Sequence, residues 1–230
     1  MNGMYAVIML IAVLTCACLL RRNQRPLDMT REQKIGIGVG AFCGAMIGSK
    51  LPFVLSDWEG MLSGMAWLSH GKTIVCGLVG GYFGVELAKW TLDVRVKTGD
   101  TFAVPVAIAI AIGRLACFNA GCCFGIETSL PWGVEFSTTS GLRHPTQLYE
   151  TIFHGIAALI LFGLQRRGGF QGHLFKLYLI SYLVYRFGTE YIRPEPKMWF
   201  NLTGYQWATL LLIPLFVWIW KSDYRFGKSH

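Results

Sequence analysis

Apolar residues gather along the chain into long segments that are separated by short polar connections. Seven of these segments are long enough, as helices, to cross a hydrocarbon core of about 30 Å. They comprise residues 4–20, 35–55, 73–90, 102–118, 148–165, 174–192 and 205–220. The pattern predicts an all-α, polytopic membrane protein with about seven transmembrane helices.

Small residues recur within several segments at the spacing of one helix face. Gly36, Gly40, Gly44 and Gly48 occupy every fourth position of the second segment. Further sets of this kind are Gly77 and Gly81, Gly80 and Gly84, and Ala103, Ala107 and Ala111. Because lipid gives no hydrophobic drive to helix association, such smooth faces stabilise helix pairs through close contact. The spacing therefore predicts tight packing between spans.

Composition agrees with a membrane setting. Of the 230 residues, 53% are hydrophobic and only 15% are charged, whereas soluble domains carry about 25% charged residues. The length suits one sizeable domain. We expect residues 1–230 to form a single transmembrane domain, with an outward-facing loop region at about residues 119–147.

Basic residues are distributed unevenly between the connections. With the N-terminus outside, the inner connections contain Arg21, Arg22, Arg25, Arg31, Lys34, Arg95, Lys97, Arg166, Arg167, Lys221, Arg225 and Lys228. The outer connections contain only Lys72, Arg143, Arg193 and Lys197. Positive residues favour the cytoplasmic side, so the N-terminus is expected outside and the C-terminus in the cytoplasm. The net charge of +8 then reflects topology and contact with anionic inner-leaflet lipid, and we expect no nucleic-acid partner.

The first segment, residues 4–20, also has the length of a cleaved signal peptide. It lacks a basic region before the apolar run, however, and Arg21 and Arg22 follow that run. We therefore expect a retained helix with its N-terminus outside.

Ionisable residues inside the apolar segments are the first candidates for chemistry. Tyr182, Arg186 and Glu190 are spaced i, i+4, i+8 and share one helix face, while Arg114 lies in another segment. A charge in hydrocarbon costs several kcal/mol, so these side chains should face the bundle interior or a wet cavity. One interpretation is an Arg186–Glu190 pair that only fixes packing. The other is a cation site in which Glu190 orients Arg186, Tyr182 donates a hydrogen bond, and both arginines bind a phosphate.

The loop between the fourth and fifth segments ends in the sequence RHPTQLYE. His144-Pro145 should break any incoming helix, and Thr146 could cap the fifth segment with Glu150 near its first turn. Arg143 and His144 would stand at a membrane mouth. They are candidates for lipid headgroup contacts or for interfacial anchors.

Three cysteines lie close together in the stretch GRLACFNAGCCFG, residues 113–125. Cys117, Cys122 and Cys123 are candidates for a disulfide on the oxidising side of the membrane, for small packing residues, or for a thiol that carries lipid transiently. Zinc binding is weakly indicated because neither a CxxC pair nor paired histidines accompany them. We expect no metal and no cofactor.

The segments IGRLACFNAGCCFG, LPWGVEF and RHPTQLYE resemble the core of the prolipoprotein diacylglyceryl transferase family, and YLVYRFGTEYIR and GYQW resemble its last two helices. The resemblance implies seven spans and a place in the bacterial cytoplasmic (inner) membrane. It also implies an enzyme of lipoprotein maturation that transfers a diacylglyceryl group from phosphatidylglycerol to a cysteine thiol of a prolipoprotein. Glycerol phosphate is released and a thioether forms.

The chain departs from the family pattern at several positions. Cys117, Ala120 and Cys122 stand where the family has asparagine, asparagine and glutamate, and Val75 stands where it has an essential histidine. His70 lies five residues upstream. These changes leave two alternatives open: a related transferase with another acceptor, and a non-catalytic lipid-binding or transport protein.

The resemblance and the buried charges together give a set of candidate site residues. The catalytic candidates are Arg186, Glu190, Tyr182 and His144. The substrate-binding candidates are Arg114, Gly113, Gly125, Arg143, Gln147, Tyr149, Glu150 and Arg193. With valine at position 75, the base that activates the thiol would be His144, Glu190 or His70, or else the acceptor would already be ionised. The expected partners are phosphatidylglycerol or another anionic phospholipid, a lipoprotein precursor and the bilayer.

Overall fold

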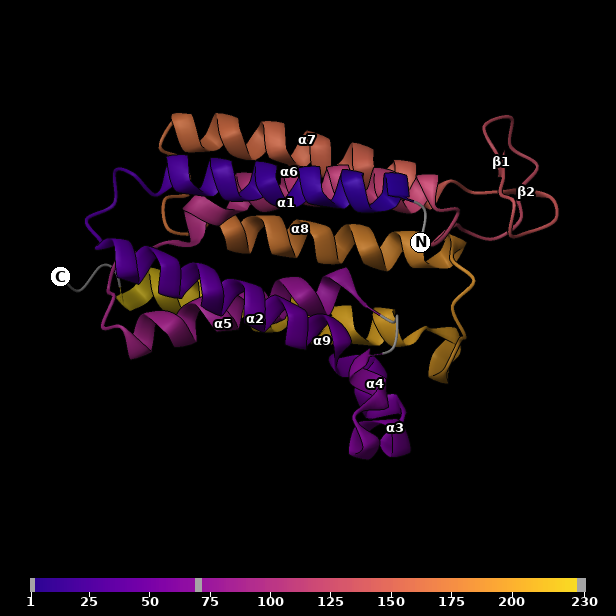
Figure 1. Cartoon of the computed structure of the whole chain (residues 1–230), viewed down its shortest axis with the longest axis horizontal. Helices are drawn as coiled ribbons and strands as arrows, with labels where there is room; N and C mark the ends of the chain where they lie inside the picture. Colours follow the sequence, from indigo (N-terminus) through magenta and orange to yellow (C-terminus); the bar gives the residue numbers. More distant parts are fainter. Residues whose placement is uncertain (1–2, 69–71, 227–230) are drawn as a thin grey trace. The chain divides into compact units, whose positions relative to one another are not determined.

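The computed structural model in Figure 1 describes residues 3–68 and 72–226, which are mostly helical. The α-helices are α1 (Gly3–Asn23), α2 (Arg31–Ser56), α3 (Trp58–Ser63), α4 (Met65–Leu68), α5 (Ile74–Thr91), α6 (Gly99–Asn119), α7 (Thr146–Arg166), α8 (Leu174–Thr189) and α9 (Gly204–Phe226). Two 3-10 helices follow α8, at Glu190–Ile192 and Trp199–Asn201. Each apolar segment picked out in the sequence is helical over nearly its whole length, so this part of the prediction is confirmed.

Four of the described helices are long and apolar enough to cross a membrane by length and composition. They are Gly3–Asn23, Arg31–Leu55, Gly99–Asn119 and Thr146–Arg166. The chain is therefore a mostly helical, multi-pass membrane protein. The count of seven spans and their orientation stay predictions.

The chain divides into two compact units. The unit Pro26–Lys97 contains α2 and α5, which pack through their glycines. A Cβ on Gly44 would lie 2.3 Å from the carbonyl oxygen of Gly80, and a Cβ on Gly40 would lie 2.6 Å from that of Gly84. The backbones approach so closely that only glycine fits, which confirms the predicted packing face on this helix pair.

The other unit comprises Met1–Arg25 and Thr98–His230 and carries the candidate site. In it α6 packs against α1, α7 and α8, and α8 packs against α9. Figure 1 shows α1, α6 and α7 running side by side. Ala103 and Ala107 of α6 have no exposed surface, whereas Ala111 is partly exposed, so this small face is buried at two of its three positions.

The start of α8 is fixed from another helix. Its N-cap residue, His173, makes no capping hydrogen bond with its side chain. Instead, the Asp100 carboxylate at the start of α6 accepts hydrogen bonds from the backbone N–H groups of Gly172 (2.5 Å) and Leu174 (2.9 Å). An acidic group at a helix N-terminus satisfies free N–H groups and complements the helix dipole. Asp100 thereby links α6 and α8 at one end.

A small hairpin lies between α6 and α7, at the end of these helices where Figure 1 labels its strands. Strands β1 (Val134–Glu135) and β2 (Leu142–Arg143) pair antiparallel. Helix α7 begins directly after Pro145, as the His-Pro break predicted. The capping role expected of Thr146 is wrong: Pro145 occupies the N-cap, and the Thr146 hydroxyl donates to the Cys123 carbonyl oxygen at 2.7 Å.

Candidate functional site

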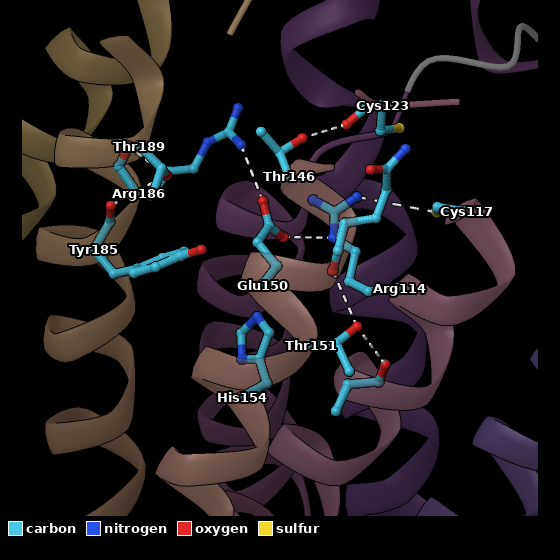
Figure 2. Close-up of polar contacts among 12 residues, drawn as sticks. Arg114, Cys117, Cys123, Thr146, Glu150, Thr151, His154, Tyr185, Arg186 and Thr189 are labelled. Carbon is cyan, nitrogen blue, oxygen red and sulfur yellow. Dashed lines mark hydrogen bonds and ion pairs between the residues drawn. The ribbon is translucent and has the colours of Figure 1, made fainter. Parts of the chain in front are cut away.

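Glu150 is the centre of a buried charged cluster. Its carboxylate, 1% exposed, accepts hydrogen bonds from three arginines that come from three parts of the chain. The Nε of Arg114 on α6 pairs with one oxygen. Arg186 on α8, at 3.2 Å, and Arg193, which follows the 3-10 helix, share the other oxygen. Glu150 therefore joins α6, α7 and the end of α8, as Figure 2 shows for Arg114 and Arg186.

The charge of Arg114 is neutralised by a carboxylate from another helix, a partner that the sequence did not identify. This partner is Glu150 of α7. Because Nε points to Glu150, the two terminal nitrogens of Arg114 remain for other contacts. One of them lies 4.0 Å from the Cys117 sulfur. Such a guanidinium can hold a carboxylate on one edge and still present donors to a second anion.

Arg186 and Glu190 form the predicted ion pair one turn apart. The Arg186 Nη2 to Glu190 Oε2 distance is 2.7 Å, and both side chains are buried. Thr203 donates to the other Glu190 oxygen at 2.9 Å, and the Arg186 guanidinium stands over the Tyr205 ring at 4.7 Å. These contacts hold Arg186 rigidly between two carboxylates. The pairing is confirmed, while its role in chemistry stays a prediction.

The cluster carries an excess of positive charge. Arg114, Arg186 and Arg193 contribute three positive charges, whereas Glu150 and Glu190 contribute two negative ones, so one positive charge remains. In addition, the Nε of Arg193 is buried and has no hydrogen-bond partner among the residues that the structure describes. An anion with a single charge and several acceptor oxygens would satisfy both features.

The loop after α6 is tied to the start of α7 by close backbone contacts. A Cβ on Gly125 would lie 2.5 Å from the Ile192 carbonyl oxygen and 2.7 Å from the His144 Cβ. The neighbouring Gln147 donates to the Cys122 carbonyl oxygen at 2.6 Å. Only glycine fits at position 125. We conclude that Gly125 and Gln147 hold the loop after α6 against the start of α7.

Two other substrate-binding candidates lie in different settings. Gly113, one residue before Arg114, has room for a side chain, since a Cβ would approach Met9 no closer than 3.6 Å. Arg143 is in β2 opposite Val134, with its guanidinium 6.0 Å from the centre of the Phe124 ring. The structure therefore places Arg143 in the hairpin and shows no close packing that requires glycine at 113.

His144 and Tyr149 form a separate group with Trp132. His144 Nδ1 lies 3.3 Å from the Tyr149 hydroxyl, which also accepts a hydrogen bond from the Trp132 indole at 2.8 Å. His144 thus belongs to the loop that precedes α7. Among the described contacts it is linked to this group and not to the arginines.

Tyr182 is buried against a histidine that sequence reasoning missed. The Tyr182 and His154 rings are 4.8 Å apart, and the His154 Nδ1 lies 2.8 Å from the Tyr178 hydroxyl. His154 is four residues after Glu150 on α7 and has no exposed surface. The i, i+4 spacing that drew attention to Tyr182 and Arg186 also applies to Glu150 and His154. The same rule, applied to the fifth apolar segment, would have found this residue.

The three cysteines come together beside the cluster. The sulfurs of Cys117, Cys122 and Cys123 lie within 4.8 Å of one another, and all three thiols are free in this structure. The pKa of the Cys123 thiol is lowered, first by hydrogen bonds with the Cys117 and Cys122 sulfurs and then by the charge of Arg114. Three convergent sulfurs are donors that a soft metal ion prefers. Sequence spacing alone had given little weight to such a site.

Val75, at the position of the family histidine, has no group that can act as a base and belongs to the unit Pro26–Lys97. His70 lies outside the described residues.

Comparison with known proteins matches nearly the whole chain to one family. Residues 3–221 match the family model described as prolipoprotein diacylglyceryl transferase. A protein of Clostridium tetani named phosphatidylglycerol--prolipoprotein diacylglyceryl transferase is 29% identical over 236 residues, covering 98% of this chain and 94% of its own length. Proteins of the same name from Geobacter sulfurreducens and Nitratidesulfovibrio vulgaris are 26% and 30% identical. They match 93% and 82% of this chain, over 86% and 72% of their own lengths.

Proposed function

Because the chain belongs to the prolipoprotein diacylglyceryl transferase family, we propose that it transfers a diacylglyceryl group from phosphatidylglycerol to a cysteine thiol of a lipoprotein precursor. The family membership confirms the resemblance seen in the motifs. The names of its relatives from three bacteria state the same donor and acceptor. The residues of the arginine cluster supply the physical support.

The observation that carries this proposal is the excess positive charge of the buried cluster. A phosphodiester such as phosphatidylglycerol bears one negative charge, which matches the single uncompensated charge around Glu150. The buried Nε of Arg193, without a hydrogen-bond partner among the described residues, offers a donor for one phosphate oxygen. Arg114 offers the edge that faces away from Glu150. Planar guanidinium donors suit phosphate oxygens, and they favour an anionic over a zwitterionic lipid.

The reaction requires stabilisation of a leaving phosphate. The acceptor sulfur attacks the glyceryl methylene carbon, the bond from this carbon to the phosphate oxygen breaks, and glycerol phosphate leaves with the electron pair. Negative charge then increases on the phosphate, where Arg114, Arg186 and Arg193 lie in a medium of low dielectric constant. Fixed charges are most effective in such a setting because they need no reorganisation. Glu150 and Glu190 orient the guanidinium groups, and Tyr182 lies one turn before Arg186 on the same helix.

We also propose the finer topology. Residues 1–230 form one transmembrane domain of seven spans in the bacterial inner membrane, with the N-terminus outside and the C-terminus in the cytoplasm. The seven helical segments and the excess of basic residues in alternate connections support this arrangement. The loop region at about residues 119–147 then faces outward, and Arg143, His144 and Tyr149 stand at the entrance for headgroups.

One observation favours a second candidate function. Val75, Cys117 and Cys122 replace polar residues of the family signature, so the acceptor of this chain could differ from a prolipoprotein thiol while the phospholipid donor is the same. Lipid turnover without precursor modification would support this candidate.

The test is transfer by the purified full-length protein in vesicles. Vesicles of phosphatidylglycerol or of phosphatidylethanolamine receive a precursor peptide with one cysteine, and mass spectrometry measures the diacylglyceryl adduct. We expect the adduct only with phosphatidylglycerol, together with release of glycerol phosphate. Rescue of a strain depleted of its own transferase, read from the loss of accumulated precursor, is the matching test in cells. Binding of phosphatidylglycerol without any turnover would instead indicate a lipid-binding protein.

A further inference from the structure

His154 is a fully buried histidine whose ring is only half satisfied. The side chain is 0% exposed. Its Nδ1 contacts the Tyr178 hydroxyl at 2.8 Å, whereas its Nε2 is buried without a hydrogen-bond partner among the described residues. Buried polar atoms are nearly always hydrogen-bonded in folded proteins. The Nε2 atom of His154 is therefore available for a contact with a substrate group.

The Tyr178 contact can set the state of this ring. A phenol hydroxyl both donates and accepts, so it is compatible with either neutral tautomer of His154. When Nδ1–H donates to the Tyr178 oxygen, Nε2 carries a free lone pair and can take up a proton. Tyr178 is then a positioning residue that holds His154 in the basic tautomer.

The ring of His154 lies among aromatic side chains and one turn from the charges. Tyr182 approaches it at 4.8 Å between ring centres and Phe153 at 5.2 Å. Figure 2 labels His154 and Glu150 on the same helix, where they are four residues apart. Glu150 and Arg114 are the charged groups on this side, and Tyr178, Tyr182 and Tyr185 are the titratable groups of α8 around it. The His154 ring thus lies close to the arginines but makes no hydrogen bond with them among the described residues.

The depth of His154 matches the geometry of the reaction. Four residues of helix place His154 about 6 Å farther along α7 than Glu150, on the side away from the loop of residues 119–147. With the phosphate at the arginines, the glyceryl carbon lies deeper in the membrane because the acyl chains extend inward. Displacement at this carbon proceeds in line, so the sulfur approaches from the side opposite the phosphate. A base for the thiol is therefore needed about one helical turn deeper than the arginines.

The other candidates for this base are occupied or lie elsewhere. Glu150 pairs with three arginines, and Glu190 pairs with Arg186 and accepts from Thr203. His144 lies before α7, on the loop side of the arginines.

We propose that His154 is the general base of the transfer, an inference that rests on the proposed function. Its Nε2 takes the proton of the acceptor thiol as the sulfur attacks the glyceryl methylene carbon. The carbon–oxygen bond to the phosphate breaks, its electron pair leaves with glycerol phosphate, and a thioether forms. The imidazolium then returns its proton to the leaving phosphate or to water. The step is a nucleophilic substitution that needs no oxidant, no reductant and no further reactant.

The experiment compares transfer rates and their pH dependence in phosphatidylglycerol vesicles. The variants are His154→Gln, which keeps the size of the side chain but cannot take up a proton, and Tyr178→Phe, which removes the contact to Nδ1. His173→Gln is the matched control, because His173 is the buried N-cap residue of α8 and lies outside the proposed site. Retention of phosphatidylglycerol by each purified variant is measured in parallel.

We expect His154→Gln to retain phosphatidylglycerol but to transfer at least about 100-fold more slowly at pH 7, the range for loss of a general base. Its residual rate should rise about tenfold per pH unit up to the thiol pKa of about 8.5, since only thiolate reacts without a base. Tyr178→Phe should slow transfer about tenfold, and His173→Gln should match the wild type.

Separate outcomes overturn the two proposals. A His154→Gln rate within threefold of the wild type, or the same reduction at every pH, contradicts the role of His154 alone. If His154→Gln fails to retain lipid, the Tyr178→Phe variant tests the inference instead. A transfer rate and pH profile of Tyr178→Phe that equal those of the wild type contradict the role of His154. A wild-type protein that transfers nothing contradicts the proposed function and the inference with it.

Discussion

Arg114 of α6 and Glu150 of α7 form a buried ion pair, although they are 36 residues apart in the sequence. Glu150 also binds Arg186 and Arg193, so a single carboxylate fixes three guanidinium groups. The arrangement explains how several cations are accommodated in the protein interior, where an isolated charge is costly. It also makes Glu150 the residue on which the geometry of the site depends.

Glu150→Gln should destabilise the protein and abolish transfer. The change keeps the shape of the side chain but leaves three buried guanidinium groups facing one another without their shared anion. Removal of one partner from a buried pair costs about 3 to 5 kcal/mol. Thermal unfolding in detergent and the vesicle transfer assay measure the two effects. Glu135→Gln, at an exposed position of β1, is the control, and equal behaviour of the two variants would contradict the central role of Glu150.

Arg114→Lys should reduce transfer about 100-fold, the effect of removing one donor to a developing anion, while the protein still inserts and folds. A lysine has one compact ammonium group, so it cannot hold Glu150 with one edge and phosphate with another. Transfer rates and retention of phosphatidylglycerol against phosphatidylethanolamine measure the loss. Arg95→Lys is the matched control because Arg95 is exposed. Normal turnover by Arg114→Lys would exclude its assignment to the phosphate.

Arg186→Ala and Glu190→Ala should each abolish turnover, and the double variant should be little worse than either. Residues that act as a unit give such non-additive losses, and these two are paired at 2.7 Å. Rates of the single and double variants measure the coupling. The ion pair of Glu86 and Lys89, which belongs to the unit Pro26–Lys97, provides the control cycle. Modest and additive losses at positions 186 and 190 would indicate a role in packing alone.

Cys123 should react with iodoacetamide at a pH well below that of an ordinary thiol, for which the pKa is about 8.5. Its lowered pKa means that the thiolate persists as the pH falls, and the reaction is lost only when the pH reaches the lowered value. Mass spectrometry of the labelled protein over a pH series measures this. Cys117→Ser removes the largest cause of the lowered Cys123 pKa. In this variant, the labelling of Cys123 should require a higher pH.

The same cysteines should be dispensable for transfer. Cys117→Ser, Cys122→Ser and Cys123→Ser should each keep most of the activity, because the acceptor supplies the reacting thiol. Detection of a diacylglyceryl adduct on one of these residues would show instead that a thiol of the protein carries the lipid.

Gly44→Ala should disrupt the packing of α2 on α5. The added Cβ would lie 2.3 Å from the Gly80 carbonyl oxygen, so the two backbones must separate. Gly38→Ala on the same helix is the control, since a Cβ there meets nothing within 4 Å. Unfolding in detergent compares the variants. An overpacked contact typically costs about 1 to 3 kcal/mol, and equal stability would contradict the close approach.

The sequence by itself determined the features that depend on local periodicity. Apolar length placed the helices, because a helix in lipid must satisfy its backbone hydrogen bonds within the segment. The i, i+4 rule gave the Arg186–Glu190 pair, since both residues lie on one helix. Regular glycine spacing likewise indicated the close approach at Gly44 and Gly80.

The tertiary structure alone decided which side chains meet across helices. The pairing of Arg114 with Glu150 depends on the rotation and register of α6 and α7, which no local pattern specifies. Nor does periodicity reveal that Arg193 joins the same carboxylate, or that Gly125 fits between His144 and Ile192. These contacts require the whole bundle, because each helix can present its polar residues to any neighbour until packing selects one.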